Sequence, residues 1–133
     1  MNQPRGDSLG DRMKTYEDVN RNKLVRRTPV IIRLDGKAFH TWTKGLDRPF
    51  DDTFIAMMAN VTKFVTDNVQ GGVFAYCQSD EISILLRDYD TLTTDAWFDN
   101  NIQKMVSIAA SLATGKFNQL ASEAFEDKPL AFF

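Results

Sequence analysis

Two aspartates stand where the sequence pattern changes, and carboxylates at such points are candidates for metal-dependent chemistry. Asp35 ends the run 30–34, which is rich in β-branched residues and apolar except for Arg33, and it is followed by Gly36. Asp80 lies in the polar stretch 78–81 between two further apolar runs. Two carboxylates that converge repel each other unless a cation binds between them. A pair of Mg²⁺ ions about 3.5–4 Å apart would neutralise them and would also serve phosphoryl chemistry.

The groups beside these aspartates suit a phosphate ligand. Gly36 has no Cβ, so its backbone can approach a ligand closely, and its carbonyl is a hard oxygen donor. Ser79 adds a hydroxyl next to Asp80. The amides that follow Gly36 could form an anion-binding nest, and they belong to Lys37, Ala38, Phe39 and His40. Taken singly, Asp-Gly and Ser-Asp-Glu are also ordinary turn sequences.

The composition restricts which metal ions the chain can bind and where in the cell we expect it. The 133 residues include one cysteine and one histidine, which excludes an internal disulfide, a Cys-based zinc site and a multi-His centre. Any metal is therefore held by oxygen, as Mg²⁺, Mn²⁺ and Ca²⁺ are. The net charge of −2 means that a polyanionic partner must be held by local basic patches or through metal. No apolar leader or membrane-length stretch is visible, so we expect a cytoplasmic protein without membrane contact.

The hydrophobic periods predict one α+β domain. Strands are expected at 30–35, 73–77 and 82–86, with helices from Asp51 or Asp52 to about 70 and from about Asp95 to Phe117. This order, β-α-β-β-α, is the ferredoxin-like palm pattern with its final strand missing or truncated. The first strand is so apolar that we expect it at the sheet centre, covered on both faces. Residues 1–28 form a helical lead-in and residues 29–133 the palm.

This topology explains why two distant aspartates should meet. In a split βαβ unit the first two strands run parallel and the third returns between them by a hairpin. The end of the first strand and the hairpin tip then lie at the same edge of the sheet. We therefore expect Asp35 and Asp80 to converge there.

The same stretches resemble a known family. The segment Ile31-Ile32-Arg33-Leu34-Asp35-Gly36-Lys37-Ala38-Phe39-His40 is similar to its strand-and-loop motif. Pro49-Phe50-Asp51-Asp52 resembles its Pro-x-Asp, and Ala75-Tyr76-Cys77-Gln78-Ser79-Asp80-Glu81 its second motif. The family is the tRNA(His) guanylyltransferases and their relatives, the 3′–5′ polymerases, and the resemblance runs from about Leu9 to the last residue.

The resemblance implies a Mg²⁺-dependent nucleotidyltransferase that adds a nucleotide, GTP favoured, to the 5′ end of tRNA after activation by ATP. It makes Asp35 and Asp80 ligands of both Mg²⁺ ions, with the Gly36 carbonyl, and makes residues 35–40 with Ser79 the lining of the nucleotide site. Asp51 would lie near the base edge. Candidates for neutralising triphosphate or tRNA are Arg33, Arg48 and Lys104. The family assembles as a tetramer, which makes a homo-oligomer an expectation here.

Several alternatives stay open. Glu81 either orients a metal-bound water or only begins the third strand, and His40 either contacts the nucleotide or packs. The family continues beyond this palm, so the chain is a fragment or a short relative, and tRNA(His) selection and general 5′-end repair are both compatible with it. A palm-fold nucleotide cyclase or signalling-nucleotide synthase is a rival enzyme. A catalytically silent nucleotide- or RNA-binding module is the rival from another class.

Overall fold

The computed structural model describes residues 8–133, and its centre is a three-stranded sheet. The strands are β1 (Val30–Asp35), β2 (Gly72–Gln78) and β3 (Glu81–Leu86), in the order β1-β3-β2. Both neighbouring pairs are antiparallel, so β1 and β2 run parallel with β3 between them. The predicted insertion of the third strand is confirmed.

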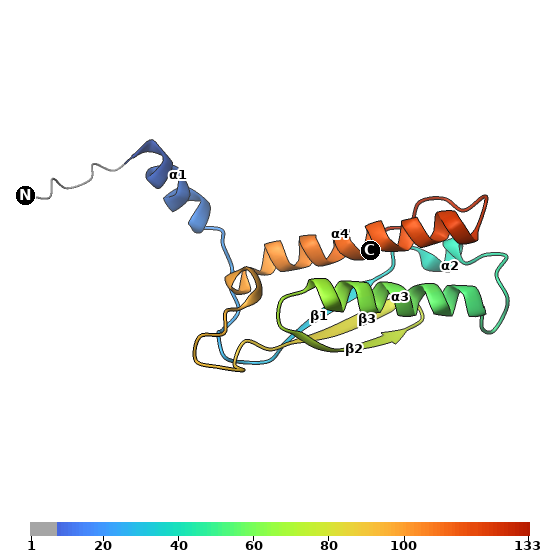
Figure 1. Ribbon diagram of the computed structural model, residues 1–133. Helices are drawn as coiled ribbons and strands as arrows, with labels where there is room; N and C mark the ends of the chain where they lie inside the picture. The colour runs from blue at the N-terminus through green and yellow to red at the C-terminus, as the bar shows by residue number, and fades with distance from the viewer. Residues whose placement is uncertain (1–7) are drawn as a thin grey trace, which may run out of the picture.

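Two long helices cover one face of this sheet (Figure 1). They are α3 (Asp52–Asn68) and α4 (Ile102–Ala124), and a short α2 (Phe39–Trp42) follows β1. The order β-α-β-β-α and the α+β class are therefore as predicted. Residues 125–133 contain no strand, although Ala131 is buried and Asn118 holds its backbone N–H and carbonyl at 2.8 Å each.

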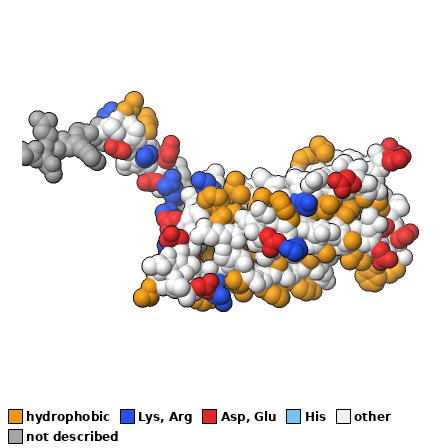
Figure 2. Space-filling model, viewed as in Figure 1, with side chains coloured by type: hydrophobic (Ala, Val, Ile, Leu, Met, Phe, Trp, Pro, Cys, Tyr) orange, Lys and Arg blue, Asp and Glu red, His pale blue; other side chains and the backbone are white. Residues whose placement is uncertain are grey.

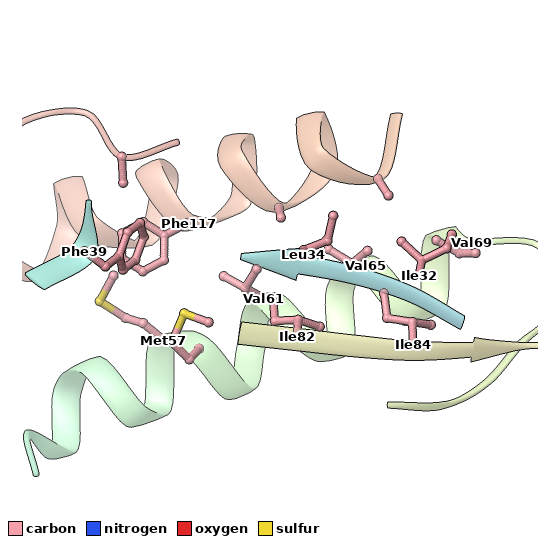
Figure 3. Packing of buried hydrophobic residues seen from close by; sticks show 14 of the residues in the cluster. Ile32, Leu34, Phe39, Met57, Val61, Val65, Val69, Ile82, Ile84 and Phe117 are labelled. Atoms are coloured by element: carbon pink, nitrogen blue, oxygen red, sulfur yellow. The ribbon is translucent and has the colours of Figure 1, made fainter. Parts of the chain in front are cut away.

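The core lies between the sheet and these helices, because every second residue of β1 and β3 points towards them. Ile32, Leu34, Ile82 and Ile84 face the helices (Figure 3). From α3 one apolar stripe is buried against the sheet, and it includes Phe54, Met58, Val61 and Val65. The stripe of α4 is rich in alanine, which lets this helix approach the sheet closely, and consists of Met105, Ala109, Ala113, Phe117 and Ala121.

The predicted position of β1 is wrong in two respects. It is an edge strand of the three, and its residues alternate between buried and exposed rather than being covered on both faces. Ile31 on the uncovered face is 68% exposed. Among residues 8–133 no helix lies on that face (Figure 1), which we call the open face. Its side chains form three cross-strand rows, which are Asp35–Glu81–Gln78, Arg33–Ser83–Tyr76 and Ile31–Leu85–Phe74.

The long C-terminal helix begins later and ends later than predicted. Phe98, Asp99 and Asn100 all have positive φ, so a 3₁₀ turn, η1 (Trp97–Asn100), precedes α4. Left-handed backbone is unfavourable for non-glycine residues and needs support. Here the buried Asn100 amide donates to the Val25 carbonyl at 3.2 Å, and the N–H of Leu24 donates to the Asn100 carbonyl at 3.0 Å.

The described part of the N-terminal lead-in begins with a helix and is fixed to the palm at its end. The helix α1 (Leu9–Asp18) has no buried residue and projects from the body (Figure 1). Acidic and basic side chains gather where it joins the body (Figure 2). Beyond it Arg26 pairs with the buried Asp88 at 2.7 Å. Residues 1–7 of the predicted lead-in lie outside the described residues, and the boundary at residue 28 stays a prediction.

Candidate active site

The structure brings Asp35 and Asp80 to the same edge of the sheet. Asp35 pairs in register with Glu81, the first residue of β3, and Asp80 precedes it in the hairpin. The N–H of Gly36 donates to the Asp80 carbonyl at 3.1 Å, which ties the end of β1 to the hairpin tip. Asp35 is exposed and Asp80 half-buried. Within residues 8–133 neither carboxylate accepts a hydrogen bond or joins an ion pair, so both are available to a ligand.

The packing of the core requires a glycine at position 36, in addition to any requirement of a bound ligand. A Cβ on Gly36 would lie 2.4 Å from Cδ1 of the Phe39 ring. That ring is buried and packs on the rings of Phe117 and Phe133, each at 5.1 Å between centroids. The expectation that Phe39 lines a nucleotide is therefore wrong for its side chain, which faces the core (Figure 3).

The loop after Gly36 offers fewer amides than expected. The N–H of Lys37 donates to the Phe132 carbonyl at 2.8 Å, which removes it from the predicted nest. Within residues 8–133 the amides of Ala38, Phe39 and His40 have no acceptor, and Ala38 has a left-handed backbone with φ of 54°. Three amides thus stay open next to the two aspartates, while the side chains of Lys37 and His40 are exposed.

Two adjoining pockets lie between the hairpin tip and the start of α3. Their volumes are about 370 and 330 Å³, and Asp51 and Ser79 line both. Arg48 lines the second pocket. The sequence analysis gave no binding role to the remaining wall of the first pocket, which consists of Pro49, Phe50, Phe54, Ile55, Met58, Cys77 and Gln78. Phe50 is 75% exposed beside Asp51, and its place in the Pro49-Phe50-Asp51-Asp52 motif was the signal that the sequence offered.

Asp51 has a structural role in this pocket. It is the N-cap of α3, with Oδ1 accepting from the Phe54 N–H at 2.8 Å and Oδ2 from the Asp47 N–H at 3.2 Å. These donors, first Phe54 and then Asp47, hold the pKa of the Asp51 carboxyl below its ordinary value. A carboxylate has about four lone-pair sites, so acceptor capacity remains towards the pocket.

The three predicted cationic residues lie in different places. Arg33 is on the open face in the row next to Asp35, and Arg48 is at the second pocket. Lys104 lies near the start of α4, with Nζ 4.8 Å from the centre of the Phe98 ring. Phe117, which packs beside Phe39, is farther along α4 by about 20 Å at 1.5 Å per residue. Lys104 is therefore not part of the Asp35–Asp80 cluster of this chain.

Glu81 belongs to the cluster by position. Its side chain lies on the open face opposite Asp35, and Oε1 is 3.4 Å from Nε of Arg33. Glu81 therefore begins the third strand and also lies beside the aspartates.

The donors at this edge match the requirements of Mg²⁺. No group of three or more His, Cys, Asp or Glu side chains within residues 8–133 is arranged to hold a metal. Mg²⁺ does not need such a cage, because it keeps several waters and binds through one or two carboxylates plus substrate phosphates. Asp35, Asp80 and the Gly36 carbonyl, which accepts no hydrogen bond from the described residues, form such a donor set.

Known proteins are similar to this chain in sequence and in fold. The sequence profile described as tRNAHis guanylyltransferase matches residues 10–133. The tRNA(His) guanylyltransferase of Schizosaccharomyces pombe is 33% identical over 107 residues, which are 79% of this chain and 38% of that protein. A bacterial tRNA(His) guanylyltransferase-like protein in complex with ATP is 52% identical with a TM-score of 0.88, over 95% of this chain and 55% of that one.

A bacterial tRNA(His) guanylyltransferase-like protein in complex with GTP is also 52% identical to this chain. Its TM-score is 0.89, over 96% of this chain and 60% of that one. This chain thus spans well under two thirds of the length of these relatives. The profile match extends over nearly all of its own length and includes Asp35, Asp80 and the pocket residues. The chain belongs to the tRNAHis guanylyltransferase family.

Proposed function

We propose that this chain is the palm of a nucleotidyltransferase that adds a nucleotide, GTP favoured, to the 5′ end of tRNA in the 3′–5′ direction. The observation that carries the proposal is the juxtaposition of Asp35 and Asp80, joined through the hydrogen bond from Gly36 to Asp80. The family and the bacterial relative solved with ATP and with GTP support the same reaction class.

Each part of the site has a role in this proposal. Asp35, Asp80 and the Gly36 carbonyl hold two Mg²⁺ ions, which when bound activate the attacking oxygen and stabilise the leaving group. The amides of residues 38–40 orient the triphosphate, because oriented N–H groups bind anions. The pocket beside Asp51 takes the base, and the exposed His40 contacts the nucleotide. A cytoplasmic location and a homotetramer remain predictions, to be tested by fractionation and light scattering.

The direct experiment incubates the chain with labelled GTP, Mg²⁺ and tRNA carrying a 5′-monophosphate or 5′-triphosphate. Asp35→Ala should lower nucleotide addition by at least about 10²-fold, because one shared ligand serves both metal ions. The matched control is Asp67→Ala, which removes an equally exposed aspartate from the far end of α3. Activity of Asp35→Ala within a few-fold of the wild type would refute the metal assignment.

Calorimetry of GTP and ATP binding, with and without Mg²⁺, provides a readout that does not depend on turnover. We expect Mg²⁺-dependent nucleotide binding that Asp35→Ala abolishes and Asp67→Ala leaves unchanged. Cyclic or dinucleotide products would instead favour a cyclase or signalling-nucleotide synthase. Nucleotide or RNA binding that is insensitive to Asp80→Ala, without any product, would identify a silent binding module.

A further inference from the structure

Arg33 has partners that its predicted role does not explain. Nε of Arg33 donates to Oγ of Ser83 at 3.2 Å and lies 3.4 Å from Oε1 of Glu81. Neutralising triphosphate does not require these two contacts, although the other guanidinium donors have no partner among residues 8–133. All three side chains lie on the open face, Arg33 opposite Ser83 and diagonal to Glu81 across the β1–β3 pair. Arg33 therefore connects the middle row of the face to the row that contains Asp35.

The ion pair matters because Glu81 is paired with one of the two aspartates and follows the other in the chain. Side chains directly opposite each other in an antiparallel pair have Cβ atoms about 4.5–5.5 Å apart, and Glu81 is directly opposite Asp35. Asp80 precedes Glu81 in the hairpin, so Glu81 is the residue next to both aspartates, through the strand pairing with Asp35 and along the chain with Asp80. Within residues 8–133 only Glu81 of the three has an ion-pair partner, and that partner is Arg33.

Stability does not account for this arrangement. The side chains of Arg33 and Glu81 are 64% and 39% exposed. Exposed pairs of this kind contribute little to folding, because water screens them and both side chains lose freedom. The ion pair therefore matters for function rather than for folding, because it sets the charge and orientation of Glu81 beside the proposed metal ligands.

We propose that Arg33 is a positioning residue that acts through Glu81. It holds the Glu81 carboxylate towards Ser83 and neutralises it in part, so that Asp35 and Asp80 receive Mg²⁺ without a third free carboxylate among them. This inference rests on the proposed function. It assigns Glu81 to the edge of the metal site rather than to direct coordination, and it removes Arg33 from the residues that contact triphosphate.

The test measures metal binding without nucleotide, using Mn²⁺ by electron paramagnetic resonance and Mg²⁺ by calorimetry. Arg33→Ala releases Glu81 and should tighten metal binding about 3- to 10-fold, the range expected for one added nearby charge in a partly solvated site. Glu81→Gln should weaken it by a similar factor. Ser83→Ala keeps both charges and should shift affinity in the direction of Arg33→Ala but less. Arg33→Lys should remain near the wild type.

The double variant decides whether Arg33 acts through Glu81. In the Glu81→Gln background, Arg33→Ala should change metal affinity by less than about twofold, because coupled residues are not additive. An equal factor in both backgrounds would show that Arg33 is only a distant charge and would overturn the proposal. Metal affinity unchanged by Arg33→Ala, with GTP binding weakened tenfold or more, would also overturn it, since that is the behaviour of a triphosphate ligand.

Two controls separate this result from misfolding and from failure of the proposed function. Arg87→Ala removes an arginine from another exposed pair, with Asp90, just beyond the opposite end of β3. It should leave metal affinity unchanged, and the thermal midpoint of Arg33→Ala should match that of Arg87→Ala. Metal binding that survives Asp35→Ala would refute the metal site itself, whatever Arg33 does.

Discussion

The two faces of the sheet are made from alternating residues of the same three strands, and they have opposite properties. The covered face presents aliphatic residues such as Ile32 and Ile84 to α3 and α4, where they are 5% and 0% exposed. The open face presents Arg33, Asp35 and Glu81 at one end and Ile31 and Phe74 at the other. A period of two therefore separates the residues that hold the fold from those that carry the proposed chemistry.

This contrast predicts that a variant on the covered face damages folding and one on the open face damages only chemistry. The separation is incomplete at the end of β1, where Gly36 belongs to both sides. Its carbonyl is a proposed metal ligand and its missing Cβ makes room for the Phe39 ring. The variants below test this difference between the two faces, and they are taken in order of the expected size of their effect.

The largest effect should come from the covered face. Phe117 is fully buried and its ring packs on those of Phe39, Trp42, Phe54 and Phe133. Phe117→Ala removes these contacts and leaves a cavity, so we expect a loss of about 3–5 kcal/mol in the free energy of unfolding. Urea denaturation followed by circular dichroism measures it. A loss below about 1 kcal/mol would show that α4 is not packed as described.

Gly36→Ala should affect both sides at once. The added methyl would meet the Phe39 ring at 2.4 Å, and overpacking of this kind costs about 1–3 kcal/mol. Nucleotide addition should fall as well, because the ring and the loop that follows must shift. The double variant Gly36→Ala/Phe39→Leu makes room for the methyl and should recover part of the stability. Lack of recovery would mean that Gly36 is needed for another reason.

The sequence predicted well where local patterns determine the structure. The three strands, the hairpin at Ser79-Asp80 and the start of α3 at Asp51 or Asp52 all follow from neighbouring residues. These features were enough to bring Asp35 and Asp80 together. The exposed face of β1 was missed because Ile31 is as apolar as its buried neighbours, although Arg33 and Asp35 at alternate positions mark the polar face.

The remaining errors concern contacts between distant segments. Phe98, Asp99 and Asn100 adopt left-handed backbone because residues 22–26 bind this turn, and helical periodicity cannot reveal that. The occupied amide of Lys37 depends on Phe132, which is 95 residues later. Each of these cases needed the tertiary structure.

An acid-dependent effect should come from the buried Asp88, which lies on neither face. Arg26, donating at 2.7 Å, and then the N–H of Arg27 hold the pKa of Asp88 below its ordinary value. This stabilisation is complete above the unfolded pKa of about 4 and is lost as the pH falls through the lower folded pKa. Asp88→Asn should therefore lower stability at neutral pH and flatten the loss that the wild type shows below about pH 4.

Thermal unfolding at a series of pH values from about 7 to 3, a range that spans the ordinary pKa of aspartate, measures how stability depends on pH in the wild type and in Asp88→Asn. Asp67→Asn is the matched control, because Asp67 is an exposed residue paired only with Lys63 within its own helix. It should keep the acid dependence of the wild type. Parallel curves for the wild type and Asp88→Asn would contradict the role given to the Arg26–Asp88 pair.

The smallest effect should come from the open face, and it is the strictest test of the contrast. Phe74 is 63% exposed in the row farthest from Asp35. Phe74→Ala changes the same side chain as Phe117→Ala, yet it should alter the free energy of unfolding by no more than about 0.5 kcal/mol. Urea denaturation under the same conditions gives the comparison directly. A loss approaching that of Phe117→Ala would mean that the open face is covered in solution, and the difference between the two faces would then no longer hold.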